Sequence, residues 1–138
     1  MSTAPLDLDP QLAAVPLFSG LSGRQRRRLL GKSKVVDHAA GREVAREGEG
    51  ALALHVILSG TATVTVGGRE VRTLGPGDHF GEISLIDGKR RSASVAADGP
   101  VRTLAVPHLA FRSLLEDDPT AAQALLVTLC ARLREAEA

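Results

Sequence analysis

Two runs in the middle of the chain carry aliphatic side chains at every second position. Residues 61–66 alternate these side chains with threonines, and residues 52–58 repeat large aliphatic side chains at the same spacing one run earlier. The aliphatic positions are Ala62, Val64 and Val66 in one run, and Leu52, Leu54, Val56 and Leu58 in the other. A period of two is that of a β-strand with a buried face. We therefore expect a strand in each run.

Glycine-rich turns divide this part of the chain into short segments. Eleven of the 14 glycines lie between Gly41 and Gly99. The turn sequences are Ser59-Gly60, the two-residue hairpin signal Gly67-Gly68, and Gly75-Pro76-Gly77-Asp78. Three more short extended runs follow at residues 71–74, 92–97 and 101–106. Many short strands joined by close turns predict a small antiparallel barrel or roll.

The two ends of the chain have helical spacing instead. Residues 12–30 carry apolar side chains at mixed helical spacing that proline and glycine interrupt, so we expect short helices there. After the last strand we expect one helix over about 108–116 and a second from Pro119 towards Ala138, capped by Asp117 or Asp118. Their apolar sets are Leu109, Phe111, Leu114 and Leu115, and then Leu125, Leu126, Leu129, Cys130 and Leu133.

These patterns predict a single domain over residues 1–138, of the mainly β class with flanking helices. We expect an antiparallel β-roll, double-stranded and jelly-roll-like, over about residues 34–106. Short N-terminal helices precede it, and a C-terminal helix pair follows over residues 108–138. The apolar stripe of the last helix has two interpretations: it packs only on its own roll, or partly on the same helix of a second chain.

Composition excludes several classes of function. Basic and acidic residues nearly cancel, 17 against 16, so bulk charge does not hold nucleic acid and we expect no nucleic-acid partner. The basic cluster over residues 24–34 is interpreted as the solvated face of a short helix whose apolar side holds Leu21, Leu29 and Leu30. No apolar run approaches the roughly 20 residues of a membrane span, so we expect no membrane partner. The first residues lack a secretory signal pattern, which favours the cytoplasm.

The sequence contains no pattern typical of a metal site or of a catalytic site. The four histidines are isolated and no His-x-His pair occurs, so we expect no metal and no cofactor. Cys130 lies in an apolar stripe, where we expect it to be buried rather than reactive. Neither Ser84 nor Ser92 sits in a hydrolase pattern, so we expect no enzyme. Phe80 and Phe111 are expected to anchor the core.

The candidate chemistry lies in residues 77–97. Gly81 is expected to leave the backbone unshielded at the start of a short helix over residues 82–86, where free N–H groups and the helix dipole attract an anion. A guanidinium, a hydroxyl and a close-lying backbone N–H follow at Arg91, Ser92 and Ala93. Together these groups suit one small phosphate.

Glu82 refines the choice of ligand. Its carboxylate would repel a bare phosphate, but it can accept hydrogen bonds from a sugar hydroxyl beside that phosphate. Glu82 and Arg91 therefore suit a sugar phosphate better than free phosphate or a nucleic-acid backbone. One arginine, rather than a cluster, suits a phosphate with a single negative charge.

This stretch resembles the phosphate-binding cassette of cyclic nucleotide-binding domains. The shared residues are Phe80-Gly81-Glu82-Ile83-Ser84-Leu85 and then Arg91-Ser92-Ala93. Other segments resemble the family's roll and its N-terminal helical segment, namely Gly41, Glu47-Gly48, residues 57–60, residues 74–78 and residues 16–21. The likeness covers nearly the whole chain. The chain is similar to bacterial cAMP receptor-type regulators, without the helix-turn-helix domain into which those regulators continue.

The resemblance implies a role for each residue of the cassette. It implies that Glu82 binds the ribose 2′-hydroxyl and that Arg91 pairs with the cyclic phosphate. The cradle is then completed by the side chain of Ser92 and by the backbone of Gly81, Ile83, Ser84 and Ala93. Phe80 would also help to couple the cassette to the following helices. Ser92 resembles bacterial cAMP-binding regulators, whereas many cGMP-selective members carry Thr there, so cAMP is favoured and cGMP is the alternative ligand.

The last helix departs from the family's pattern. The family often caps the base with an aromatic or polar residue of this helix, but residues 132–138 hold no aromatic residue, Ser or Thr. Base contacts are then expected from Arg132, Leu133 or Arg134, from a second subunit, or from a partner.

We therefore expect a non-catalytic sensor that binds a cyclic nucleotide and switches its C-terminal helices. A protein partner or a second subunit would recognise the changed surface of the last helix, in a monomer or a homodimer. The alternative is a degenerate β-roll that serves as a protein-interaction module and binds no nucleotide.

Overall fold

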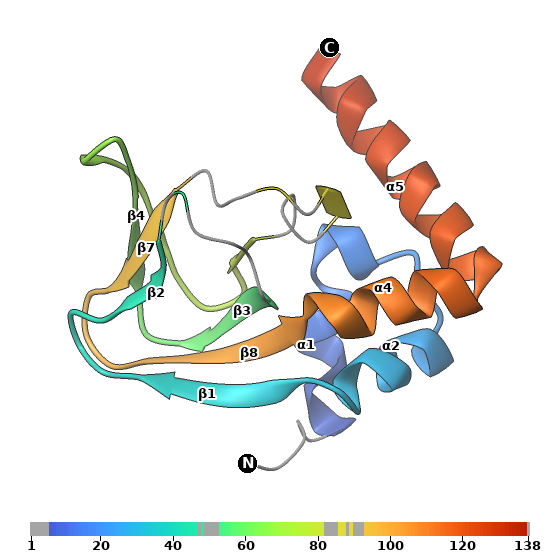
Figure 1. Ribbon diagram of the computed structural model, residues 1–138, viewed down its shortest axis with the longest axis horizontal. Coiled ribbons are helices and arrows are strands. Elements are labelled where there is room, and N and C mark those ends of the chain that lie inside the picture. Colours follow the sequence, from blue (N-terminus) through green and yellow to red (C-terminus); the bar gives the residue numbers. More distant parts are fainter. Residues whose placement is uncertain are drawn as a thin grey trace.

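The computed structural model describes residues 6–46, 48, 53–81, 86–87, 89 and 93–137, and Figure 1 shows their arrangement. The elements in chain order are η1 (Leu6–Leu8), α1 (Asp9–Ala13), η2 (Pro16–Phe18), α2 (Gly23–Leu30), β1 (Lys34–His38), β2 (Glu43–Ala45), β3 (Ala53–Ser59), β4 (Ala62–Val66), β5 (Arg69–Leu74), β6 (His79–Phe80), β7 (Ser94–Ala97), β8 (Val101–Pro107), α4 (His108–Asp117) and α5 (Pro119–Glu137). Short helices, strands and two final helices follow one another as the sequence predicts.

The described strands form two antiparallel sheets of four strands each. The first sheet has the order β1-β8-β3-β6, and the second has the order β2-β7-β4-β5. Both sheets send side chains into one apolar cluster. Its members are Ala45, Ile57, Ala62, Val64, Leu74, Phe80, Val95, Ala97 and Val101. The predicted mainly β fold, an antiparallel roll with flanking helices, is therefore confirmed, and this cluster is its interior.

Two turns explain why glycine is concentrated between the strands. Gly67 and Gly68 join β4 to β5 with φ values of 59° and 78°, which confirms the predicted two-residue hairpin. Gly60 has a φ of 86°, and a Cβ atom there would lie 2.3 Å from the backbone carbonyl oxygen of Pro100. Only glycine fits this second position without moving the strand that follows Pro100.

The helices gather at the end of the first sheet where β8 leads into α4, and they bury a second apolar cluster against it (Figure 1). Leu54 and Val56 of β3 enter this cluster, together with Leu104 and Val106 of β8. The helices contribute the rings of Phe18 and Phe111, whose centroids are 5.7 Å apart, and the side chains of Leu21, Leu29 and Leu30. The expectation of a buried apolar side on the basic helix is confirmed for Leu29 and Leu30, whereas Leu21 is buried but precedes α2.

β3 is buried on both faces because it separates the two clusters. Leu54 and Val56 face the helices, whereas Ile57 faces the roll interior and the strand pairing shifts between Ile57 and Ser59. Leu58 packs again on the helical side. β3 therefore contacts both the roll interior and the helices outside it.

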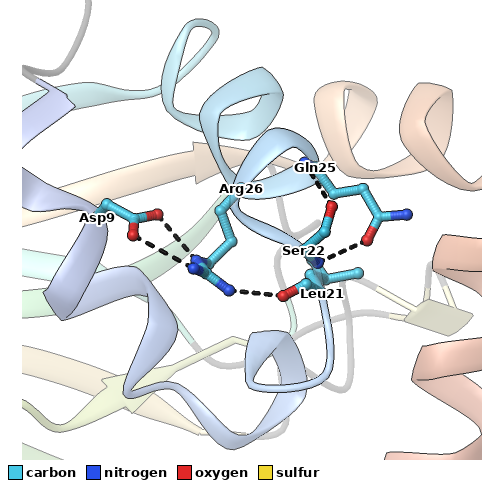
Figure 2. A network of polar contacts seen from close by, with 5 residues as sticks. All are labelled: Asp9, Leu21, Ser22, Gln25 and Arg26. Atoms are coloured by element: carbon cyan, nitrogen blue, oxygen red, sulfur yellow. Dashed lines mark hydrogen bonds and ion pairs between the residues drawn. The ribbon is translucent and has the colours of Figure 1, made fainter.

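Polar contacts fix the first turn of α2 against α1, as Figure 2 shows. Ser22 begins the helix with a capping box, because its Oγ accepts from the Gln25 N–H and its own N–H donates to Gln25 Oε1. Arg26 donates from Nε to Asp9 Oδ1 at 2.8 Å and from Nη1 to the Leu21 carbonyl oxygen at 2.6 Å. One member of the basic cluster is thus used to hold the N-terminal helices together.

α5 begins as predicted at Pro119, where Asp118 accepts from the Thr120 backbone N–H at 3.1 Å. Its apolar stripe is only partly buried: Leu125 is 6% exposed, but Leu133 is 61% exposed. The expectation that Cys130 is buried is wrong, because α5 leaves the body of the molecule beyond its first turns (Figure 1). Leu109, expected in the apolar set of α4, is also largely exposed.

Candidate functional site

The structure describes the two edges of the predicted cassette. Phe80 ends β6 and is 7% exposed, Gly81 follows with a φ of 92°, and Ala93 packs on the roll interior just before β7. The other predicted cassette residues, Glu82, Ile83, Ser84, Arg91 and Ser92, lie outside the described residues. The positive φ of Gly81 lies in the left-handed region that glycine tolerates best.

Phe80 is attached to the first sheet through a histidine. β6 pairs with β3 so that Phe80 lies opposite His55, and their rings stack with centroids 5.1 Å apart and planes 14° apart. Phe80 belongs to the roll interior, as the sequence led us to expect of a core anchor. His55 lies between Leu54 and Val56, which pack on the helices. Phe80 thus has a short connection to the helices through β3.

A buried threonine links His55 to a second histidine. Thr103 of β8 is completely buried, and its Oγ1 lies 3.1 Å from His55 Nδ1 and 3.0 Å from His38 Nε2. The four side chains His38, Thr103, His55 and Phe80 therefore cross β1, β8, β3 and β6 in the order of the sheet. We call these four residues the His-Thr-His-Phe row.

No local sequence pattern indicated this row, because the histidines are isolated along the chain. His38 and His55 are 17 positions apart in the chain, but β8 brings both rings to one hydroxyl. The sequence signal that could have indicated the row is a polar residue at an inward-facing position in each of three strands, namely His38 in β1, His55 in β3 and Thr103 in β8. Within the described ranges no group of three or more His, Cys, Asp or Glu side chains gathers as a metal site would require.

The surroundings of His38 favour its neutral form. A hydroxyl has one hydrogen, so Thr103 can donate to one imidazole while it accepts from the other. Burial lowers the pKa of His38, the nearby charge of Arg42 lowers it further, and Asp37 opposes both effects. The folded protein therefore disfavours the charged imidazolium at this place.

The predicted base-contacting residues lie near the end of α5. Arg132, Leu133 and Arg134 are all exposed there, on the part of the helix that extends from the body (Figure 1). Whether any of them reaches a nucleotide base stays a prediction. The described portion of the chain has no helix of the length and apolar character needed to cross a membrane.

Comparison with known proteins identifies relatives of this chain. The family model of the cyclic nucleotide-binding domain matches residues 35–118. The CRP-like cAMP-activated global transcriptional regulator of Mycobacterium tuberculosis is 33% identical over 132 residues, which cover 92% of this chain and 59% of that regulator. The cGMP-dependent protein kinase of Toxoplasma gondii is 36% identical over 87 residues, which cover 63% of this chain and 9% of the kinase. The chain thus matches only part of each relative.

A solved structure agrees with these relatives. The N-terminal domain of a transcriptional regulator from Streptomyces coelicolor A3(2) superposes with a TM-score of 0.80 at 31% identity. The match covers 91% of this chain and 94% of that domain. The likeness therefore extends over most of this chain and of that domain.

Proposed function

The chain belongs to the cyclic nucleotide-binding domain family, and from this premise we propose that it is a non-catalytic sensor of cAMP. The observation that carries the proposal is the cassette sequence, in which Glu82 and Arg91 follow the positive-φ residue Gly81 at the family's spacing. Arg91 pairs with the cyclic phosphate, and Glu82 accepts from the ribose 2′-hydroxyl. Ser92 favours cAMP, and cGMP is the alternative ligand.

The proposed signal passes from the cassette to the helices. Ligand binding tightens the backbone after Gly81 and shifts Phe80, which stacks on His55. His55 shares Thr103 with His38, and Thr103 lies on β8, which leads directly into α4. The proposed switch is a change in how α4 and α5 sit on the sheet. The proposed switch requires no cofactor besides the nucleotide. In this proposal residues 1–138 form a single domain.

We further propose that a protein partner or a second subunit binds α5 and thereby responds to the change in its position. Leu126, Val127 and Leu133 are 57%, 59% and 61% exposed on this helix, although all three are large apolar side chains. Leu126 and Leu133 are seven residues apart, so they lie on one side of α5 with Cys130 between them. Such a stripe suits a helix of another chain.

Titration calorimetry with cAMP and cGMP tests the ligand. We expect saturable binding of cAMP, and Arg91→Ala should weaken it about ten- to hundredfold because a charge-assisted contact to the phosphate is lost. Arg90→Ala is the matched control, since the resemblance gives Arg90 no contact, and it should bind as the parent does. Folded protein that binds neither nucleotide at millimolar concentration would favour the degenerate interaction module instead.

A further inference from the structure

A groove with a volume of about 320 Å³ lies between α2 and α4, next to the end of β8. Figure 1 shows the two helices side by side there. The residues that line the groove are Arg28, Lys32, Pro107, Leu109, Ala110 and Ser113. Its apolar lining residues are Leu109, which is 67% exposed, together with Pro107 and Ala110. None of these residues belongs to the cassette.

The rim of the groove is cationic. Lys32 is exposed and makes no ion pair with any described residue. Arg24 lies four residues before Arg28 on α2, so it continues the same side of that helix, and it is likewise exposed. On α4 the exposed Arg112 follows Leu109 by three residues. Arg28 and Lys32 thus line the groove itself, and the exposed Arg24 and Arg112 lie on the same two helices outside its lining.

Arg28 is held in place rather than free to move. It forms an ion pair with Asp117 and donates from Nη2 to the Ser113 carbonyl oxygen at 3.3 Å. These contacts connect α2 to α4 beside the groove. Glu116 and Asp117 are the carboxylates of α4 and lie at its C-terminal end, where Asp117 pairs with Arg28. Lys32 is therefore the lining cation without an ion pair to a described residue.

We propose that this groove docks an acidic segment of a partner protein. An apolar side chain of that segment enters the groove beside Leu109, and flanking carboxylates face Lys32, Arg24 and Arg112. An apolar anchor surrounded by opposite charges is the arrangement that gives protein interfaces both affinity and orientation. A nucleic-acid backbone would satisfy the cations but would leave Leu109 without an apolar partner. The proposal does not depend on nucleotide binding.

A designed peptide tests the proposal on the full chain. The probe is a fluorescein-labelled helical peptide of about 16 residues, with leucines on one stripe and glutamates elsewhere. Its fluorescence anisotropy should report saturable binding that weakens as salt is raised. Leu109→Ala should weaken binding about fivefold and Lys32→Glu about tenfold. Both side chains are exposed, so both variants should keep the parent's melting temperature.

Matched variants and peptides make the test specific. Val71→Ala and Arg69→Glu make the same kinds of change at exposed positions of β5, in the other sheet, and should leave binding unchanged. Replacing the probe's leucines by alanine, or its glutamates by glutamine, should each weaken binding at least about tenfold. The proposal is overturned if either changed peptide binds as tightly as the original probe. Tight binding of the alanine peptide would indicate that charge alone is responsible, and tight binding of the glutamine peptide would indicate apolar contact alone. The proposal is also overturned by an equal loss in the β5 variants, or by the absence of saturable binding at millimolar protein.

Discussion

The hydroxyl of Thr103 lies 3.1 Å from Nδ1 of His55, inside the roll and between adjacent strands. His55 stacks on Phe80, which directly precedes Gly81 at the edge of the cassette. A single buried hydroxyl therefore helps to orient the ring that supports the proposed ligand site. This arrangement connects the polar row of the first sheet to the residues that would close around a nucleotide.

Thr103→Val should destabilise the fold. The valine keeps the shape of threonine but removes the partner of two imidazoles, and leaving a buried polar group unsatisfied costs about 1–3 kcal/mol. Urea unfolding measures the change. Thr65→Val on β4 is the matched control, because Thr65 is only half-buried, and it should change the free energy of unfolding by less than about 0.5 kcal/mol. Equal effects in the two variants would show that Thr103 contributes shape alone.

The stability of the fold should depend on pH through His38. Its pKa is lowered in the folded protein, chiefly by burial and then by Arg42, so the unfolded chain binds the proton more tightly. The stabilisation is fully present above the unfolded histidine pKa of about 6.5 and is lost as pH falls through the lower folded pKa. Asp37 and Asp118 have lowered pKa values too, and their stabilisation is lost only in more acidic solution.

Unfolding free energies measured between about pH 5 and pH 7 test this dependence. His38→Gln should flatten the profile, because glutamine keeps hydrogen-bonding capacity towards Thr103 but does not titrate. His108→Gln removes a histidine outside the His-Thr-His-Phe row and is the matched control. A profile that is unchanged in His38→Gln, or that flattens equally in both variants, would contradict the assignment.

Gly60→Ala should be strongly destabilising. The added methyl group would lie 2.3 Å from the Pro100 carbonyl oxygen, and the φ of 86° is unfavourable for alanine. We expect a loss of at least about 2 kcal/mol in the free energy of unfolding. Gly99→Ala is the matched control, since a Cβ atom there meets nothing within 4 Å and its φ is not positive. A similar loss in both variants would mean that general turn flexibility, rather than the close contact, is responsible.

Arg26→Ala should cost more stability than the removal of an exposed arginine. Arg26 is 17% exposed in its side chain and joins Asp9 to the Leu21 carbonyl oxygen, as Figure 2 shows. We expect a loss of about 1–3 kcal/mol. Arg27→Ala, which removes an exposed neighbour in the same helix, should have little effect. Thermal unfolding of both variants provides the comparison, and similar melting temperatures would contradict the prediction.

Glu82→Gln separates the sugar contact from the phosphate contact. It should weaken cAMP binding but leave a 2′-deoxy analogue almost unchanged, because that ligand has no hydroxyl to donate. Arg91→Ala should weaken both ligands alike, since both carry the cyclic phosphate. Calorimetric titration of the two variants with the two ligands completes the cycle. If Glu82→Gln weakened the binding of both ligands equally, Glu82 would hold the loop in place and would not contact the ribose 2′-hydroxyl.

Local sequence patterns accounted for most of the elements. The alternation over residues 61–66 predicted β4, and Gly67-Gly68 predicted its hairpin with β5, because both depend on neighbours in the chain. The start of α5 at Pro119 followed from a capping residue and a proline in the right order. Strand ends were less accurate: the run expected over residues 71–74 begins at Arg69.

The cassette and the fold class were set by the sequence alone, because a few residue types at fixed local spacing specify both the turns and the candidate phosphate site. Tertiary structure alone decided which side chains meet across strands. It brought His38 and His55 to Thr103, and it left Leu109 and Cys130 exposed although each lies in an apolar helical stripe. Helical periodicity shows that residues share a face, but burial depends on whether another element covers that face. Strand register between distant segments brings together residues that no local pattern relates.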